Sequence, residues 1–352
     1  MDNLKNILKI AFVYIGTIIG AGFASGQEML SFFTVYGFNG VYGLILTGFL
    51  FFVVGWAVLE LVQGQNVETF KDFIRPITGD AIGTSLEWVI MAFMFTCFCA
   101  MLAGGGALLE QRFGWPYLVG VIVMAIACYI TFLFDVKGVV LVNSILAPIL
   151  LIGCLLLGLY IWIFRSSEAF YNLSVLLFDL RNNWFSSALI YVSYNTVTAI
   201  VILTTLHKYV INKKTAFFSA LIAGVSLGML GICLGIITLI NYNSIQGVEI
   251  PMLTIVMQYA PLIQYIYILV IIAAMFTTAV ANGYGIVAKL KAKEKDSNFG
   301  IFIFVMMGVL VAQIGFSTMV SKVYPVFGYI GLLELILILM YFIKYKTNQR
   351  KR

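Results

Sequence analysis

At residues 16–23 the chain reads Gly16-Thr17-Ile18-Ile19-Gly20-Ala21-Gly22-Phe23, in the middle of its first hydrophobic segment. A helix that crosses a membrane has to satisfy its backbone hydrogen bonds internally, because lipid offers no partner. Glycine weakens a helix, and unwound backbone at membrane depth is tolerated only where it is buried in protein or lines a cavity. The stretch therefore predicts a broken helix that forms part of a binding site. The alternative is that its small residues only allow close packing of another helix.

The composition of the chain is that of a membrane protein. Hydrophobic residues make up 62% of its 352 residues and charged residues 10%, and the mean hydropathy is +1.03. Soluble domains carry about 25% charged residues. We therefore expect an all-α polytopic membrane protein with residues 1–352 in a single transmembrane domain.

Ten segments of the chain are long and apolar enough to span a bilayer, for which about 20 residues are needed. The long third and fourth segments are separated by a predicted turn at residues 111–116, which contain Gly114 and Pro116. The ten predicted spans are 7–34, 39–63, 83–110, 116–134, 139–164, 184–206, 214–241, 261–290, 298–317 and 322–343.

The distribution of basic residues sets the orientation. With the N-terminus inside, all 21 Lys and Arg residues fall on the inner side except Arg112, Arg165, Arg181 and Lys322, as the positive-inside rule requires. We expect a multi-pass protein of the cell (plasma) membrane with both termini in the cytoplasm. The net charge of +6 then reflects orientation and contact with the lipid bilayer. It does not indicate a nucleic-acid partner, and no obligate protein partner is expected.

Ten spans divide into two halves of five, and an odd number per half forces opposite orientations, as in transporters built from inverted repeats. The predicted repeats are 1–165 and 166–343, followed by a basic tail at 344–352. In such folds the first helix of each half is often broken around the site. The sixth span has polar residues from Ser193 to Thr198 at its middle, which predicts a second break. The alternative is hydrogen bonding between helices.

The run Ile18–Phe23 resembles the first-helix break of the amino acid–polyamine–organocation superfamily, whose members share the LeuT-type five-plus-five fold. The wider run Gly16–Glu28, GTIIGAGFASGQE, is similar to the YkvI-type bacterial membrane proteins within that superfamily. The resemblance extends over all ten spans. It implies a secondary active transporter that works by alternating access.

The resemblance also implies a sodium site. Sodium-coupled members bind the ion between the first and eighth helices, through two carbonyls before the break and through a carbonyl and two hydroxyls on the eighth helix. The matching residues are Gly16, Ile19, Ala274, Thr277 and Thr278. Oxygen ligands suit a hard cation. The alternative for the threonines is bonding of their hydroxyls to the preceding helical turn. No cofactor other than the coupling ion is expected.

The solute is predicted to bind between the two breaks. Free amides of Ala21, Gly22 and Phe23 suit an anionic group such as a carboxylate, so we expect a small carboxylate-bearing or amino-acid-like solute. Side chains from other spans are predicted to contact the rest of the solute: Tyr191, Tyr194 and Asn195 from the sixth span and Phe98 from the third.

Two carboxylic acids, Glu28 and Glu334, fall within predicted spans. Charged residues at such depth are costly and are functional hypotheses by default, so each is a candidate for gating or proton coupling. Two alternatives to sodium symport follow from the sequence. One is a proton-coupled transporter that uses Glu28 or Glu334, and the other is a ligand-sensing receptor without transport.

An intramembrane enzyme is not expected. Ser25 would need a base at the same depth to act as a nucleophile, but the single histidine, His207, lies at the predicted inner face. The chain also has no HExxH zinc motif.

Overall fold

The computed structural model describes residues 2–65, 67, 69–133, 153, 160, 183–293 and 298–350. The predicted fifth span, 139–164, and the predicted boundary between the repeats at residue 165 lie outside the described residues, apart from the isolated positions 153 and 160. Within the described part, all regular structure is helical, and six of its helices are long and apolar enough to cross a membrane. The chain is therefore a polytopic all-α membrane protein.

The first hydrophobic segment is broken where its glycines predict a break. It consists of α1 (Asp2–Ile18), α2 (Ala21–Ala24) and α3 (Gln27–Phe32). Gly20 is extended between α1 and α2. Gly26 separates α2 from α3 with a φ of 78°, a left-handed conformation that favours glycine. The two glycines thus turn one span into three helical pieces.

The other predicted spans that lie within the described residues are also helical. The helix α5 begins earlier than predicted, is interrupted at Gly79 and ends before Gly114, whose φ of 68° forms the turn predicted at 111–116. The remaining elements are η1 (Thr34–Tyr36), α4 (Asn39–Gln65), α5 (Phe70–Phe113), α6 (Tyr117–Leu133), α8 (Trp184–Thr204), η2 (His207–Tyr209), α9 (Lys213–Ile240), α10 (Tyr242–Ile245), α11 (Pro251–Tyr259), α12 (Gln264–Lys293), α13 (Asn298–Ala312), α14 (Phe316–Thr318), η3 (Met319–Val323) and α15 (Tyr324–Arg350). Because α15 continues through Arg350, most of the predicted tail is helical.

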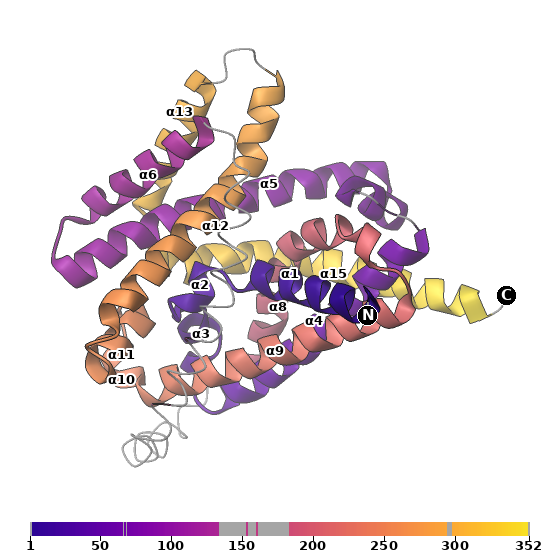
Figure 1. The fold of residues 1–352 in the computed structure, drawn as a ribbon, viewed down its shortest axis with the longest axis horizontal. Coiled ribbons are helices and arrows are strands. Elements are labelled where there is room, and N and C mark those ends of the chain that lie inside the picture. Colours follow the sequence, from indigo (N-terminus) through magenta and orange to yellow (C-terminus); the bar gives the residue numbers. More distant parts are fainter. Residues whose placement is uncertain are drawn as a thin grey trace.

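Two groups of helices pack around the broken segment (Figure 1). In one group α4 contacts α8 and α9, and α1 contacts α8 and α9. In the other group α5 contacts α6, α12 and α13. The two groups meet where α2 contacts α12 and α15 contacts α8, α4 and α5. The break between α1 and α2 therefore lies where the two groups meet.

The helices α4 and α9 are in close contact. A Cβ atom added at Gly48 would lie 2.8 Å from the Cα of Gly228 and 3.1 Å from the carbonyl oxygen of Gly224. The two backbones thus touch, as small residues allow in membrane helices. This contact makes α4 and α9 a rigid support for the segment that carries the break.

The predicted break in the sixth span is wrong, because α8 runs without interruption from Trp184 to Thr204. Its polar side chains bond to their own helix and leave the backbone helical, which is the usual behaviour of Ser and Thr within spans. The donors and accepting carbonyls are Ser193 to Leu189 at 2.7 Å, Asn195 to Tyr191 at 3.0 Å, Thr196 to Ser193 at 2.9 Å and Thr198 to Asn195 at 3.1 Å. Of the two spans predicted to be broken, only the first is interrupted.

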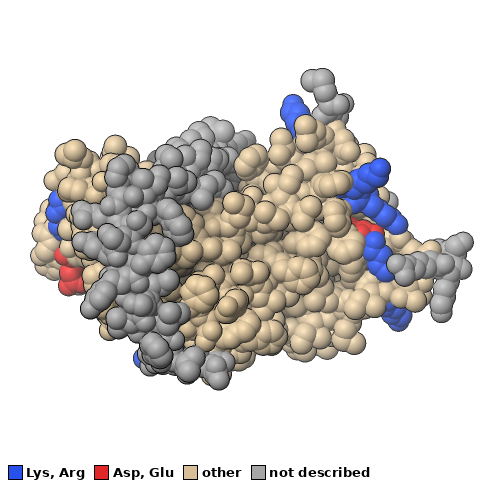
Figure 2. All heavy atoms as spheres, turned by 90° about the horizontal axis from the view of Figure 1, so that it is seen from below, with Lys and Arg blue, Asp and Glu red and all other residues tan. Residues whose placement is uncertain are grey.

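Charged residues are unevenly distributed over the molecule. Figure 2 shows that most of the Lys and Arg side chains on one face gather at the end where α15 finishes. The middle of that face is formed by uncharged residues. This is the pattern expected of a protein whose centre is embedded in lipid.

Candidate functional site

The backbone is left unpaired on the N-terminal side of α2. The last bonds of α1 run from the Ile19 amide to the Ile15 carbonyl (2.8 Å) and from the Gly20 amide to the Ile18 carbonyl (2.9 Å). Among the described residues, no donor reaches the carbonyls of Gly16 and Ile19, and no acceptor reaches the amides of residues 21–23. Ile19 and residues 21–23 are buried, and buried backbone groups are nearly always paired. This side of α2 therefore has free acceptors and free donors for a ligand.

The C-terminal side of α2 is fully bonded, in contrast. The Ala24 carbonyl accepts a bond from the Tyr267 hydroxyl of α12 at 2.6 Å. The Ser25 carbonyl accepts one from the amide of Met252 in α11 at 2.9 Å, and the Ser25 hydroxyl donates to the Gly22 carbonyl at 2.8 Å. The second interruption is thus closed by protein partners, and only the first is open.

The predicted cation ligands of the eighth span lie on α12, which faces this opening. A Cβ atom added at Gly20 would lie 3.8 Å from the hydroxyl oxygen of Thr278, so the break and Thr278 are in contact. Thr277 and Ala274 are buried, and the Thr277 hydroxyl donates to the Ala274 carbonyl at 3.2 Å. The structure therefore places Thr278 beside the break, and Thr277 is bonded back to its own helix.

Glu28 lies at the break as well, although it is six residues further along the chain than Gly22. Its side chain is buried, and its carboxylate accepts a hydrogen bond from the Tyr191 hydroxyl of α8 at 3.0 Å. The other carboxylate oxygen lies so close to Gly22 that an added Cβ atom would be 2.4 Å from it. The Glu28 carboxylate therefore lies against Gly22, next to the amides that were predicted to hold an anion.

Aromatic rings cluster around Tyr191, the tyrosine that donates to this carboxylate. Tyr191 and Tyr194 are 5.4 Å apart between ring centroids, and Phe32 of α3 lies 5.5 and 5.4 Å from them. Phe93 of α5 and Tyr324 of α15 contact Tyr194 at 5.9 and 5.3 Å. The buried Tyr194 hydroxyl has no hydrogen bond of normal geometry within the described part of the chain. An acidic group next to aromatic rings is suited to a cation.

The ring contacts of Phe98, the predicted wall of the site, are not with the site tyrosines. The ring of Phe98 stacks on Phe304 at 4.8 Å and lies 6.0 Å from Phe132, so its ring contacts are with α13 and α6. Phe93, five residues earlier, contacts the site tyrosine instead. No sequence signal separates these two, because both are apolar residues of one long helix. Asn195 uses its amide for its own helix, as described above.

Glu334, the second predicted acid, lies on the face of α15 that packs against α8. One turn before it, an added Cβ atom at Gly331 would be 2.9 Å from the Ser193 carbonyl oxygen. Glu334 is 1% exposed, and neither carboxylate oxygen has a hydrogen-bond partner among the described residues. No hydrogen bond or ion pair among the described residues joins it to the break.

Two proteins of Bacillus subtilis (strain 168) are similar to this chain along most of its length. It is 27% identical over 325 residues to the uncharacterized membrane protein YkvI, which covers 92% of each chain. It is 26% identical over 336 residues to the uncharacterized protein YyaD, which covers 95% of this chain and 96% of YyaD. No protein-family model matches the chain.

Two solved structures share its fold. A crystal structure of MhsT in complex with L-phenylalanine gives a TM-score of 0.64 at 16% identity and covers 94% of this chain and 88% of MhsT. An inward-facing conformation of Mhp1 gives a TM-score of 0.54 at 13% identity and covers 96% of this chain and 76% of Mhp1. Both are LeuT-fold secondary transporters rather than enzymes. The chain therefore has a LeuT-type fold.

Proposed function

We propose that this protein is a sodium-coupled secondary transporter that carries a small amino-acid-like solute across the cell membrane by alternating access, with both termini in the cytoplasm. The observation that carries the proposal is the open side of α2, where buried backbone carbonyls and amides lack partners. Such groups are costly unless a ligand satisfies them. In a fold shared with secondary transporters, that ligand is the transported solute and its coupling ion.

The carbonyl side of the opening suits a cation. No described backbone donor bonds to the carbonyls of Gly16 and Ile19, and Thr278 lies close to Gly20 on the facing helix. Sodium prefers oxygen ligands, as other hard cations do. With the Ala274 carbonyl and the Thr277 hydroxyl, these residues would supply five neutral oxygens without a buried carboxylate.

The amide side of the opening suits a zwitterion. The helix α2 has only four residues, so the three amides of residues 21–23, rather than a long helix dipole, would hold the carboxylate of the solute. Glu28 would pair with its ammonium group, and the rings next to Glu28 favour the same charge. L-phenylalanine, present in the MhsT structure, carries both groups.

Sodium binding can be tested without knowing the solute. Thermal unfolding of the purified protein should shift upward in NaCl relative to choline chloride, because a ligand at 100 times its Kd stabilises by about 2.7 kcal/mol. Thr277→Ala with Thr278→Ala should abolish the shift. The matched control is Thr204→Ala with Thr205→Ala, an adjacent pair on α8 whose hydroxyls also bond to their own helix at 2.8 and 2.7 Å. An unchanged shift in the first double variant would contradict the sodium site.

The solute class is tested by the same measurement with amino acids, simple amines and simple carboxylates, each with and without sodium. Zwitterions should stabilise the protein more in sodium than either of the other two classes does. A hit is then tested for uptake into proteoliposomes under an inward sodium gradient. Binding without uptake would support the receptor alternative.

Proton coupling is the second candidate, and Glu334 is the observation that favours it. A buried carboxylate without a described partner is better tolerated when it carries a proton. Uptake driven by a pH gradient at equal sodium on both sides of the membrane would support this candidate over sodium symport.

A further inference from the structure

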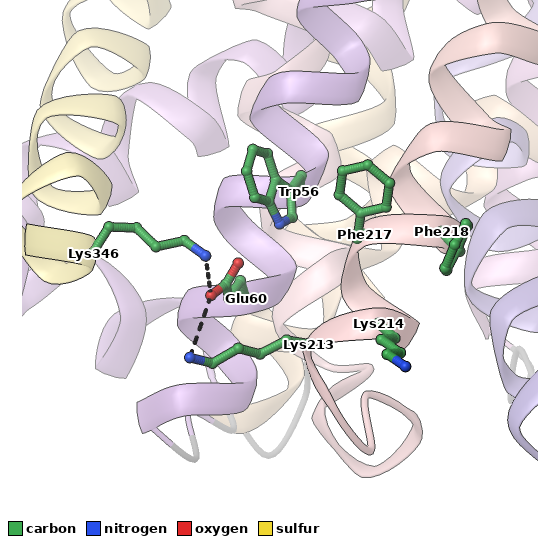
Figure 3. Close-up of a pocket in the computed structure, with 7 residues that line it drawn as sticks. All are labelled: Trp56, Glu60, Lys213, Lys214, Phe217, Phe218 and Lys346. Carbon is green, nitrogen blue, oxygen red and sulfur yellow. Dashed lines mark ion pairs between the residues drawn. The ribbon is translucent and has the colours of Figure 1, made fainter. Parts of the chain in front are cut away.

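A pocket of about 220 Å³ opens between α4, α9 and α15. Figure 3 shows its lining residues, which are Trp56, Glu60, Lys213, Lys214, Phe217, Phe218 and Lys346. It lies toward the end of α15, where basic residues gather (Figure 2). None of its lining residues belongs to the break. Pockets for whole small molecules measure about 300–1,000 Å³. This pocket is smaller than that range, so it suits a single charged group of a ligand rather than a whole small molecule.

The pocket has more positive than negative charge. Its one acid, Glu60, is buried, and a single carboxylate oxygen lies 2.6 Å from the Lys346 ammonium and 4.0 Å from that of Lys213 (Figure 3). Lys214 forms no ion pair with any described residue. Two lysines face the one carboxylate, and the Lys214 ammonium points away from it (Figure 3). With three lysines and one acid in its lining, the pocket keeps an excess of two positive charges. An anion would balance that excess.

The lysines also stand at an unusual place in their helix. Lys213 and Lys214 are the first two residues of α9, which has 28 residues and begins at its N-cap Asn212. The N-terminal end of a helix carries partial positive charge and normally favours acidic side chains. Two lysines there add to the positive field instead of offsetting it. The arrangement is favourable when an anion is bound and unfavourable when it is not.

The pocket contains aromatic side chains of the kind found at the membrane–water interface. The ammonium of Lys346 lies 5.0 Å from the ring centroid of Trp56, and Trp56 packs against Phe217 at 5.5 Å. Phe218 is exposed. Trp is enriched at the level of lipid headgroups, and basic pockets between transmembrane helices on the cytoplasmic side bind anionic headgroups. The exposed ring offers contact to an acyl chain, which a free anion would not use.

We propose that this pocket binds the phosphate of an anionic phospholipid from the cytoplasmic leaflet, with Lys213, Lys214 and Lys346 as its ligands. A bound phosphate would link the start of α9 to the end of α15 through charge. Lys346 would remain shared with Glu60, which holds it in place in the absence of lipid. The site is separate from the opening beside α2, so this proposal does not depend on sodium coupling or on the identity of the solute.

The test is retention of phosphatidylglycerol by the purified full-length protein, measured by native mass spectrometry from bilayers of phosphatidylcholine and phosphatidylglycerol. Lys213→Gln with Lys214→Gln should weaken retention about thirtyfold, because each lysine near an anionic surface contributes about fivefold. The matched control is Lys5→Gln with Lys344→Gln, which removes two exposed lysines that do not line the pocket. The control should retain the lipid nearly as well as the unmodified protein.

Three results would overturn the proposal. One is equal loss of phosphatidylglycerol in the control and pocket variants, which would mean attraction to the surface charge alone. Another is no preference for phosphatidylglycerol over phosphatidylcholine. The third is that inorganic phosphate in detergent stabilises the protein against thermal unfolding as much as phosphatidylglycerol does. That result would assign the pocket to a free anion. Thermal unfolding in phosphatidylcholine alone checks that the pocket variant is folded.

Discussion

Gly22 is the position where a single methyl group tests the geometry of the site. In Gly22→Ala the new Cβ atom would lie 2.4 Å from a carboxylate oxygen of Glu28, whereas real Cβ contacts essentially never fall below 3.0 Å. The carboxylate therefore has to move by at least about 0.6 Å, which displaces the group that accepts the 3.0 Å hydrogen bond from the Tyr191 hydroxyl. A hydrogen bond to a charged group contributes about 1.5–3 kcal/mol to stability, and we expect the free energy of unfolding to fall by that amount.

The measurement is equilibrium unfolding in detergent micelles titrated with SDS, arranged as a double-mutant cycle with Glu28→Ala. Once the Glu28 side chain is shortened, Gly22→Ala should cost almost nothing, so the two substitutions should couple by about 1.5–3 kcal/mol. Gly20→Ala is the matched control, because its Cβ atom would meet Thr278 at an ordinary 3.8 Å and its backbone is extended. Equal costs for Gly22→Ala with and without the Glu28 carboxylate would refute the placement of Glu28 at the break.

Three further predictions concern other parts of the molecule. Gly48→Ala should lower the free energy of unfolding by about 1–3 kcal/mol in the same titration, because the new methyl group meets the backbone of Gly228 at 2.8 Å. Lys9→Gln should raise the pKa of Tyr209, which a hydrogen bond from Lys9 and its charge hold below the usual value; ultraviolet titration against Tyr209→Phe measures this, and an unchanged pKa would contradict the contact. Glu334→Gln should keep sodium-driven uptake within about twofold of the unmodified protein, and loss of uptake with solute binding intact would favour proton coupling.

Local sequence patterns were informative about the first span and misleading about the sixth. Glycine has no side chain that could bond to the backbone, so its effect on a helix does not depend on side-chain contacts. Gly20 and Gly26 therefore marked the two interruptions directly. Ser193 and its polar neighbours have side chains that can serve either an opened backbone or a closed helix. In α8 they bond to their own helix, and composition alone does not distinguish the two outcomes.

The role of Glu28 illustrates a second kind of limit. From the sequence it is an acid beyond the break, suited to a gate or a proton path. Because Gly26 turns the chain and α3 packs against α8, its carboxylate returns to Gly22 and meets Tyr191. The hydrogen bond between Tyr191 and Glu28 joins residues 163 positions apart in the chain. No periodicity within one segment predicts such a contact.

The sequence by itself determined that this is a polytopic helical membrane protein, where most of its spans lie, and that the first span is broken. These follow from hydropathy and glycine content, which act within a single segment, because lipid forces each span to satisfy its own backbone. Tertiary structure alone decided which residues of separate segments lie together. It placed the open side of α2 near Thr278 and Glu28 beside Gly22. It also placed Phe93, rather than Phe98, against Tyr194. Those contacts depend on how separate helices pack, and packing is set by the shapes of many side chains at once.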